Sequence, residues 1–307
     1  MILSTHDLAI VGGGPAGMAA ALVAGRCRLD AVVINEENPR NRVTIASHGF
    51  LTRDGVHPLE LLQVAKSQLQ KYPSVIYYTD QVIAALEEDD GGFRIQRAVG
   101  PEIHAQRVII AAGNRDDLDS LRLPGIHDVY GKSVYPCPFC DGFEHSDERI
   151  AVFGAEGVER HVPIIKMWSD DVHVFTNGRT LSTQAKQELD RNSVSVHEGR
   201  VRRLVSQDGR LVEVQLENES IERDAGFLWD KAGVPSNTLA DDLGVPRNMN
   251  PWGIVTYQAD EFGRTSVPGV YVVGDLRSGF SRLTVAAAEG GRCVEHIVHE
   301  ISMEMCR

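Results

Sequence analysis

The stretch Tyr135–Glu144, YPCPFCDGFE, places two cysteines three positions apart, with an aspartate directly after the second. Cys137 and Cys140 at this spacing could bind a metal, form a structural disulfide or act as a redox couple. A zinc site needs about four ligands, usually from two such pairs, and the chain has one pair. A disulfide that closes so short a loop restrains little of the unfolded chain. The spacing therefore favours a redox couple, which exchanges disulfides through a thiolate.

The residues around the cysteines also suit thiol chemistry. Pro138, between them, fits the first turn of a helix, and a helix start lowers the pKa of a nearby thiol. Asp141 and Glu144 oppose a thiolate by charge repulsion. We therefore interpret Asp141 as a proton shuttle, which takes a proton from one thiol and returns it to a leaving thiolate. The alternative is a turn residue beside Gly142.

A glycine-rich turn near the start of the chain predicts a dinucleotide site. Gly12, Gly14 and Gly17 follow an apolar run of strand length and precede a helix-forming segment. The first glycine permits a tight turn, the second lets a pyrophosphate approach the backbone, and the third allows close helix–strand packing. The N-terminus of the helix would hold the phosphates. The acid that ends the next strand, Glu36, would bind ribose hydroxyls, with Asn35 as a neutral alternative.

Two later strand ends indicate which dinucleotide binds. One strand ends in the small residues Ala112 and Gly113, and a strand far downstream ends at Gly274 and Asp275. An aspartate at the carboxyl end of a strand suits the polyol chain of a flavin. The helix after it, from about Arg282, would direct its N-terminus at the electron-rich edge of the flavin. Asp275 alone could be a helix cap, but together with the first turn it favours FAD.

A second strand, turn and helix are expected after Ile150–Phe153, but the glycine pattern fails there. Gly154 takes the first position, whereas Glu156 and Glu159 stand where the second glycine and the third small residue should be. A carboxylate close to a pyrophosphate costs roughly 1 kcal/mol in water and about 4 kcal/mol at an effective dielectric of 20. Only Arg179 offers charge for a 2′-phosphate. We expect poor NAD(P)H binding, unless the loop shifts and both acids point outward.

Composition sets the broad class of the protein. The chain has 307 residues, is 42% hydrophobic, and carries a net charge of -12 from 31 basic and 43 acidic side chains. Its length predicts two domains of ordinary size. The negative charge disfavours nucleic acid or an anionic membrane as a partner. No stretch approaches a membrane span, and no targeting segment precedes the first strand, so we expect a cytoplasmic location.

Four segments occur in an order that resembles a known family: VGGGPAGMAAAL, IIAAGN, CPFCDGF and TSVPGVYVVGD. The chain is similar to the low-molecular-weight thioredoxin reductases. It looks closer still to the thioredoxin-reductase-like flavoproteins that include dithiol oxidases of natural-product pathways. The resemblance implies an α/β fold with two Rossmann-like nucleotide-binding domains, the second inserted into the first, and a homodimer. Residues 1–120 and 249–307 would bind FAD, and the central NAD(P)H-type domain, residues 121–248, would carry the cysteines.

The resemblance also implies roles for individual residues. Cys140 would face the flavin, and Cys137 would form a mixed disulfide with the substrate. Asp141 matches the reductases, whereas in the dithiol oxidases a histidine often stands at that place. His48 would lie on the flavin side or the substrate side, or else be a surface histidine. The residues expected to hold FAD are Gly12, Gly14, Pro15, Ala16, Gly17, Asn35, Glu36, Arg42, His48, Ala112, Gly113, Gly274, Asp275, Arg282, Thr284 and Val285.

The sequence thus predicts an FAD-dependent dithiol/disulfide oxidoreductase that uses Cys137 and Cys140 as its redox pair. Because the second glycine turn is degraded, we favour oxidation of a dithiol with oxygen as the acceptor. The substrate would be a small dithiol or a thioredoxin-like protein. An NAD(P)H-dependent reductase of the thioredoxin reductase type is the alternative, supported by Asp141. A flavin-bound redox sensor without turnover is a third possibility.

Overall fold

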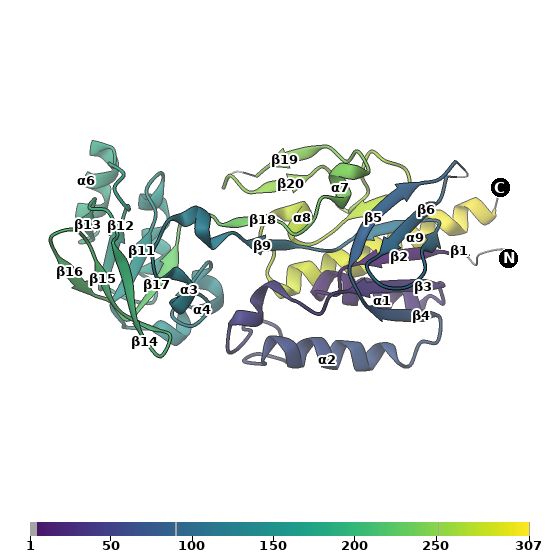
Figure 1. Cartoon of the computed structure of the whole chain (residues 1–307), viewed down its shortest axis with the longest axis horizontal. Helices are drawn as coiled ribbons and strands as arrows, with labels where there is room; N and C mark the ends of the chain where they lie inside the picture. The colour runs from purple at the N-terminus through teal and green to yellow at the C-terminus, as the bar shows by residue number, and fades with distance from the viewer. Residues whose placement is uncertain (1–4, 90, 251, 307) are drawn as a thin grey trace. The chain divides into compact units, whose positions relative to one another are not determined.

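The computed structural model describes residues 5–89, 91–250 and 252–306. The chain forms two compact units (Figure 1), one of residues 1–42, 49–115 and 233–307 and one of residues 43–48 and 116–232. The second unit is therefore inserted into the first. The sequence placed the return crossover near residue 248, but that segment forms a hairpin of β19 (Arg247–Met249) and β20 (Val255–Tyr257) within the first unit. Which nucleotide each unit binds remains a prediction.

The first unit is built on a five-stranded parallel sheet. Its order is β21 (Val270–Val272), β8 (Val108–Ile110), β2 (Leu8–Val11), β3 (Ala31–Asn35) and β4 (Val75–Thr79). The inner strands are almost continuously apolar, as expected of parallel strands that are covered on both faces. Helices α1 (Pro15–Arg26), α2 (Pro58–Leu69) and α9 (Leu283–Met305) contribute to the core on one face.

The other face of this sheet packs against a second, four-stranded sheet. That sheet has the order β1 (Thr5–His6), β7 (Ile103–Ala105), β6 (Phe93–Arg97) and β5 (Val82–Glu87). The alternation along β2 divides the two cores: Leu8 and Ile10 belong to the helical side, and Ala9 and Val11 to the sheet side. This period of two is the one that a strand buried on both faces must follow.

Helices α1 and α9 lie side by side in the first unit, although they come from opposite ends of the chain (Figure 1). They approach so closely that a Cβ on Gly290 would lie 1.9 Å from the carbonyl oxygen of Ala16. Glycine at this position of α9 is therefore a packing requirement, since no side chain fits between the helices. The contact joins the start of the chain to its end beside the first glycine turn.

The second unit contains another five-stranded parallel sheet. Its order is β10 (Val134–Tyr135), β17 (Ala225–Leu228), β11 (Ile150–Phe153), β12 (Val172–Phe175) and β13 (Ser195–His197). One face packs on α5 (Val162–Ile165) and α6 (Thr183–Arg191). The other face is covered by α3 (Ile126–Val129) and an antiparallel sheet of β14 (Arg203–Gln207), β15 (Arg210–Gln215) and β16 (Ser220–Glu222).

The helix expected after the second glycine turn is much shorter than its counterpart in the first unit. The 12 residues of α1 form one continuous helix, whereas β11 is followed by a 3₁₀ turn, Val158–Arg160, and then by the four residues of α5. Pro163 lies in the first turn of α5. Proline has no amide hydrogen and disfavours a helical conformation in the residue before it, so a helix cannot run unbroken through this point.

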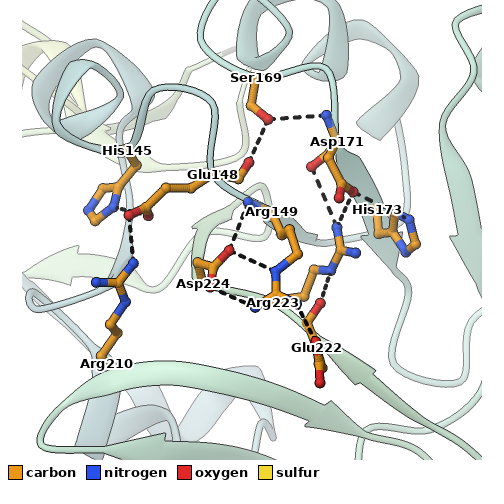
Figure 2. Close-up of polar contacts among 10 residues, drawn as sticks. All are labelled: His145, Glu148, Arg149, Ser169, Asp171, His173, Arg210, Glu222, Arg223 and Asp224. Atoms are coloured by element: carbon orange, nitrogen blue, oxygen red, sulfur yellow. Dashed lines mark hydrogen bonds and ion pairs between the residues drawn. The ribbon is translucent and has the colours of Figure 1, made fainter.

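Ion pairs hold together the amino-terminal edge of the second sheet (Figure 2). Arg149, Asp171 and Asp224 directly precede β11, β12 and β17. Arg149 donates to Asp224 with an Nε–Oδ2 distance of 2.8 Å, and Arg223 donates to Asp171 with an Nη1–Oδ1 distance of 2.5 Å. The opposite edge, where the strands end, is therefore the one at which loops can vary.

The same network reaches the segment that carries the cysteines (Figure 2). Glu148 accepts from Arg210 at 2.7 Å and lies 2.8 Å from Nδ1 of His145. His145 ends the short 3₁₀ turn η3 (Phe143–His145), which follows the cysteine pair. The segment after the pair is thus anchored to the sheet. Among the described residues, no helix combines the length and apolarity that crossing a membrane requires.

Candidate redox and cofactor sites

The residues predicted to bind FAD gather at the carboxyl edge of the first sheet. Strand β2 leads into Gly12, β3 ends at Asn35, β8 leads toward Gly113, and β21 leads toward Asp275. These four strands are adjacent and parallel. Their carboxyl ends therefore share one edge, which is where open α/β sheets bind nucleotides.

The glycines at this edge divide into two kinds. Gly12 has φ +101°, and a Cβ there would lie 2.5 Å from the carbonyl oxygen of Ala111. A Cβ on Gly17 would lie 1.9 Å from the carbonyl oxygen of Gly12. These two glycines are required by the fold itself. A Cβ on Gly14 or Gly113 would meet nothing within 4 Å, so these positions leave open space at the turn, which fits a dinucleotide.

Helix α1 begins at this turn with the geometry that phosphate binding needs. Gly14 is its N-cap residue, and Pro15 is in its first turn, where the missing amide hydrogen costs nothing. No acidic residue lies in that turn, so the positive end of the helix dipole stays uncompensated by a side chain. A cavity of about 230 Å³ adjoins the turn, bordered by residues that include Gly13, Gly14 and Leu283.

The structure separates the two candidates at the end of β3. Asn35 accepts from the backbone amide of Gly13 at 3.0 Å and donates to the hydroxyl of Tyr77 at 2.9 Å. It therefore braces the glycine turn. Glu36, the next residue, is exposed. Glu36 thus offers the carboxylate at this edge that could accept ribose hydroxyls.

Asp275 lies in a polar cluster that the sequence did not reveal in full. Its carboxylate accepts from the backbone amide of Ser281 at 2.6 Å and from Arg40 at 3.1 Å. The Arg40 guanidinium also lies over the ring of Phe280, 4.8 Å from its centroid. Arg42, the arginine chosen from the sequence, is exposed. Two arginines in one polar segment gave no signal by which to choose between them.

The helix predicted from about Arg282 begins there. Arg282 is the N-cap of α9, and Thr284 and Val285 are exposed on its first turn. Gly274, with φ +70°, donates its backbone amide to the buried carboxylate of Glu289 at 2.7 Å. His48 belongs to the second compact unit, where its Nδ1 lies 3.5 Å from the Glu144 carboxylate. Its place on the flavin side stays a prediction.

The cysteine pair lies beyond the carboxyl end of β10. Cys137 is the N-cap of the short helix α4 (Pro138–Asp141), with Pro138 as its first residue, as the sequence predicted. Cys137 is 7% exposed and Cys140 is partly exposed. The Cys140 thiol, hydrogen-bonded to Cys137, lowers the pKa of Cys137 to about 7, and backbone amides and Lys231 assist against the effect of burial. At neutral pH Cys137 is therefore substantially a thiolate.

Asp141 shows the opposite shift. Burial, the charge of Cys137 and the charge of Glu144 raise its pKa to about 8. A thiol with a lowered pKa thus stands beside a carboxyl with a raised one, and the proton at neutral pH rests on the carboxyl. A carboxylic acid in that state can donate a proton to a leaving thiolate.

The approach to the cysteines is apolar. Phe139 is 60% exposed and Phe143 is 78% exposed, so neither is a core residue. Phe139 makes an edge-on contact with Trp168, with ring centroids 5.9 Å apart. The sequence left open whether these aromatic residues pack in the core or line a substrate approach, and their exposure favours the second.

The second glycine turn is covered by Trp229, which directly follows β17. A Cβ on Gly154 would lie 2.6 Å from the Cβ of Trp229, and one on Gly157 would lie 3.5 Å from its indole ring. The indole Nε1 donates to the carbonyl oxygen of Glu156 at 2.5 Å. The ring of buried His161 packs against the indole, with centroids 4.8 Å apart. The indole thus lies where a pyrophosphate would approach the turn.

The basic residue near this turn is also engaged. Arg179 forms an ion pair with Asp230 and donates to the carbonyl oxygen of Thr176 at 3.0 Å. Trp229 and Asp230 were not predicted from the sequence. The available signal was their position: a large aromatic residue and an acid directly after a buried strand, at the edge where a nucleotide would bind.

A model of the pyridine nucleotide-disulphide oxidoreductase family matches residues 6–290. The chain belongs to this family. HlmI, a solved structure, is 32% identical and superimposes with a TM-score of 0.89, covering 98% of this chain and 94% of its own. TrxB of Bacillus anthracis, provisionally named a thioredoxin reductase, is 33% identical with a TM-score of 0.91, covering 98% and 99%. Thioredoxin reductase aclD of Aspergillus oryzae is 26% identical, covering 99% of each chain.

This pyridine nucleotide-disulphide oxidoreductase is an FAD-dependent, thioredoxin-reductase-like thiol-disulfide oxidoreductase, which confirms the class of enzyme predicted from the sequence. The α/β fold with two parallel sheets is likewise confirmed. When bound, FAD supplies a site that accepts and releases electron pairs. The open space at Gly14 and Gly113, the start of α1 and the carboxylate of Glu36 are the features of this chain that would hold it.

Proposed function

We propose that this protein oxidises a dithiol substrate to a disulfide and passes the electrons through FAD to oxygen. The observation that carries the proposal is Trp229, whose indole lies against the second glycine turn and donates to the Glu156 carbonyl. An enzyme that draws its electrons from NAD(P)H needs that surface for the pyrophosphate. An enzyme that draws them from its thiol substrate does not.

Three further features of the second unit would, like Trp229, weaken the binding of NAD(P)H. Glu156 is exposed at the turn, Arg179 is paired with Asp230, and α5 has only four residues. A carboxylate near a phosphate costs roughly 1 to 4 kcal/mol, depending on the local dielectric. A helix dipole contributes about 0.3 to 1 kcal/mol at an exposed site. Together with the indole, these amounts suffice to lower affinity by orders of magnitude.

The exchange proceeds through two attacks on sulfur. A substrate thiolate attacks Cys137 Sγ of the Cys137–Cys140 disulfide, the bond between the cysteines breaks, and its electron pair leaves on Cys140 Sγ. A substrate–Cys137 mixed disulfide has then formed. The second substrate thiolate attacks the substrate sulfur of that bond, so the substrate disulfide forms and the electron pair leaves on Cys137 Sγ.

The protons and electrons of this exchange must also be accounted for. Asp141, protonated at neutral pH, donates to a leaving thiolate and takes a proton back when the pair closes again. Closing the pair releases two electrons, which FAD, when bound, would accept, and oxygen would be the final acceptor, reduced to hydrogen peroxide. The sum is one dithiol plus one O₂ to one disulfide plus one H₂O₂. The substrate, a small dithiol or a thioredoxin-like protein, and the homodimer stay predictions from the family.

A second candidate function is NAD(P)H-dependent disulfide reduction. It is favoured by Asp141, which follows Cys140 as in the reductases that the sequence resembles, and by the thioredoxin reductase names of several relatives. In that case Trp229 would have to leave the second turn when the nucleotide binds. The two directions use the same cysteines and differ in the source of the electrons.

Anaerobic rapid mixing separates the two directions. The flavin-loaded protein is mixed with NADPH, with NADH and with dithiothreitol, and bleaching of the flavin absorbance is followed. We expect bleaching by the dithiol alone, and one peroxide per disulfide when air is admitted. Rapid bleaching by micromolar NADPH would refute oxidation as the physiological direction. Bleaching by the dithiol without peroxide or turnover in air would favour a redox sensor.

A further inference from the structure

The turn that covers the second glycine loop also reaches the cysteines. Strands β10 and β17 are parallel neighbours, with Val134 opposite Gly226 and Tyr135 opposite Phe227. Continued two residues beyond the pair Tyr135 and Phe227, the same register would bring Cys137 opposite Trp229, which directly follows β17. Residues 229–232 therefore lie at the same edge of the sheet as the N-cap of α4.

Lys231 holds its positive charge at this edge. Its ammonium lies over the indole of Trp229, 5.0 Å from the ring centroid. A cation above an indole face is held by about 0.5 to 2 kcal/mol, depending on desolvation. The residue as a whole is partly exposed.

The charges that act on Cys137 come from several elements. Asp141 on α4 interacts electrostatically with Cys137, Glu144 on η3 acts on Asp141, and Cys140 donates to the Cys137 sulfur. His161, which packs on Trp229, stays neutral because burial and the nearby Lys231 lower its pKa to about 4. Lys231 is the positively charged group that favours the Cys137 thiolate.

We propose that Lys231 is a positioning residue for thiol-disulfide exchange, which stabilises negative charge on Cys137 Sγ from the turn that also places Trp229 against the second glycine loop. The charge matters at the moment when Cys137 leaves the mixed disulfide. A thiolate of lower pKa leaves faster, and the electron pair that the breaking S–S bond places on Cys137 Sγ is then met by a cation.

The inference uses the site of the proposed function but holds for either direction of exchange. In oxidation Cys137 is the leaving group, and in reduction it is the attacking thiolate. A charge effect on Cys137 can therefore be measured without turnover, and its failure is distinct from failure of the oxidase proposal, which depends on the response to NADPH.

The test is the pH dependence of Cys137 alkylation in the reduced, flavin-loaded protein. Iodoacetamide is added anaerobically between pH 5 and pH 10, and modification of Cys137 is followed by peptide mass. In Lys231→Met we expect the midpoint to rise by about half to one pH unit, because an opposite charge has been removed from the thiolate. Exchange with dithiothreitol at pH 7 should slow roughly threefold.

Two variants separate charge from shape. Lys231→Arg retains the cation and should keep the midpoint close to that of the wild type. Lys166→Met removes a lysine of the same unit that lies 3.7 Å from Asp170, and should leave the midpoint unchanged. If Lys231→Met does not fold, Lys231→Gln is the second neutral variant. An unchanged midpoint in a folded neutral variant, or an equal rise in Lys231→Arg, would overturn the proposal.

Discussion

The two glycine turns of this protein follow strands of the same kind at the same edge of two parallel sheets, yet they differ in the residues that surround them. In the first turn a Cβ on Gly14 would meet nothing within 4 Å, and a helix of 12 residues follows. In the second turn Glu156 stands at the position of Gly14, the Trp229 indole donates to its carbonyl oxygen, and a four-residue helix follows. The glycine pattern alone does not make a nucleotide site, because the neighbouring strand decides what fills the space.

The second unit also has structural features that do not depend on a nucleotide. Strand β11 is completely buried, and the glycines that remain nearby serve packing. A Cβ on Gly226 would lie 2.9 Å from the ring of Phe153, so the position has a structural reason that is independent of any nucleotide. The sheet persists because β10, which leads to Cys137, is paired to it through β17. The second unit thus supports the segment that carries the cysteines.

The largest effect is expected from giving the first turn the carboxylate that the second turn has at the equivalent position. Gly14→Glu places a side chain in open space, so we expect the protein to fold but to lose FAD and all flavin-dependent activity. Repulsion of roughly 1 to 4 kcal/mol for each close charge pair adds to the blocked approach of the backbone. Flavin absorbance after purification and reconstitution measures the loss, with circular dichroism as the check on folding.

The matched control for this change is Glu156→Gln in the second turn, which should leave the flavin content unaltered. A Gly14→Glu protein that retains a full complement of FAD would show that the dinucleotide does not approach this turn, and the contrast between the two turns would lose its meaning.

Thiol-disulfide exchange at the cysteine pair of the second unit should depend on Asp141. Asp141→Asn removes the proton donor, and we expect dithiol turnover to fall roughly 10²-fold or more. In the wild type, turnover should fall as pH rises through about 8, where the carboxyl loses its proton, and this limb should be absent in the variant. A pH profile of peroxide production measures both. An unchanged alkaline limb in Asp141→Asn would assign it to another group.

Stability gives the same substitution a second readout. The folded-state pKa of Asp141 is raised from 3.8 to about 8, so its contribution to stability is present below pH 4 and is lost as pH rises toward 8. Asp141→Asn should therefore melt higher than the wild type at pH 8 and about equally at pH 4. Thermal unfolding at the two pH values tests the sign directly, and a lower melting temperature at pH 8 would contradict it.

The smallest effect is expected from restoring the second turn. Replacing Trp229, Glu156 and Glu159 together by Gly, Gly and Ala removes the indole and both carboxylates, and NADPH affinity should rise about tenfold or more. The gain is limited because the helix after the turn stays short. Titration with NADPH under anaerobic conditions measures it. Wild-type protein that already binds NADPH as tightly as the triple variant would contradict the premise.

Patterns that are local in sequence predicted much of this molecule. The strand before Gly12, the helix after it, the proline-led turn at Cys137 and the start of α9 at Arg282 each depend on neighbouring residues, and the structure has them. The insertion of one unit into the other followed from the resemblance. The family and the class of enzyme followed from four segments taken together.

What the sequence did not provide was the pairing of segments distant in the chain. Trp229 lies against the glycine turn that begins about 75 residues earlier, and Lys231 follows in the same turn, about 90 residues after Cys137. The strand order β10–β17–β11 brings these segments to one edge of the sheet. The pairing of His48 with Glu144, within the second unit, likewise had no signal in the sequence. The domain boundary predicted between residues 248 and 249 falls in a hairpin, because linkers and hairpin turns use the same turn-forming residues.

The ion pairs at the amino-terminal edge of the second sheet bear on how such a protein can change over time. Arg149 with Asp224 and Arg223 with Asp171 tie the strands together at the end remote from the sulfurs. Substitutions in the loops at the other end then perturb folding little. A lineage could in this way exchange one electron source for another by altering a handful of loop positions, while the scaffold beneath them stays as it was.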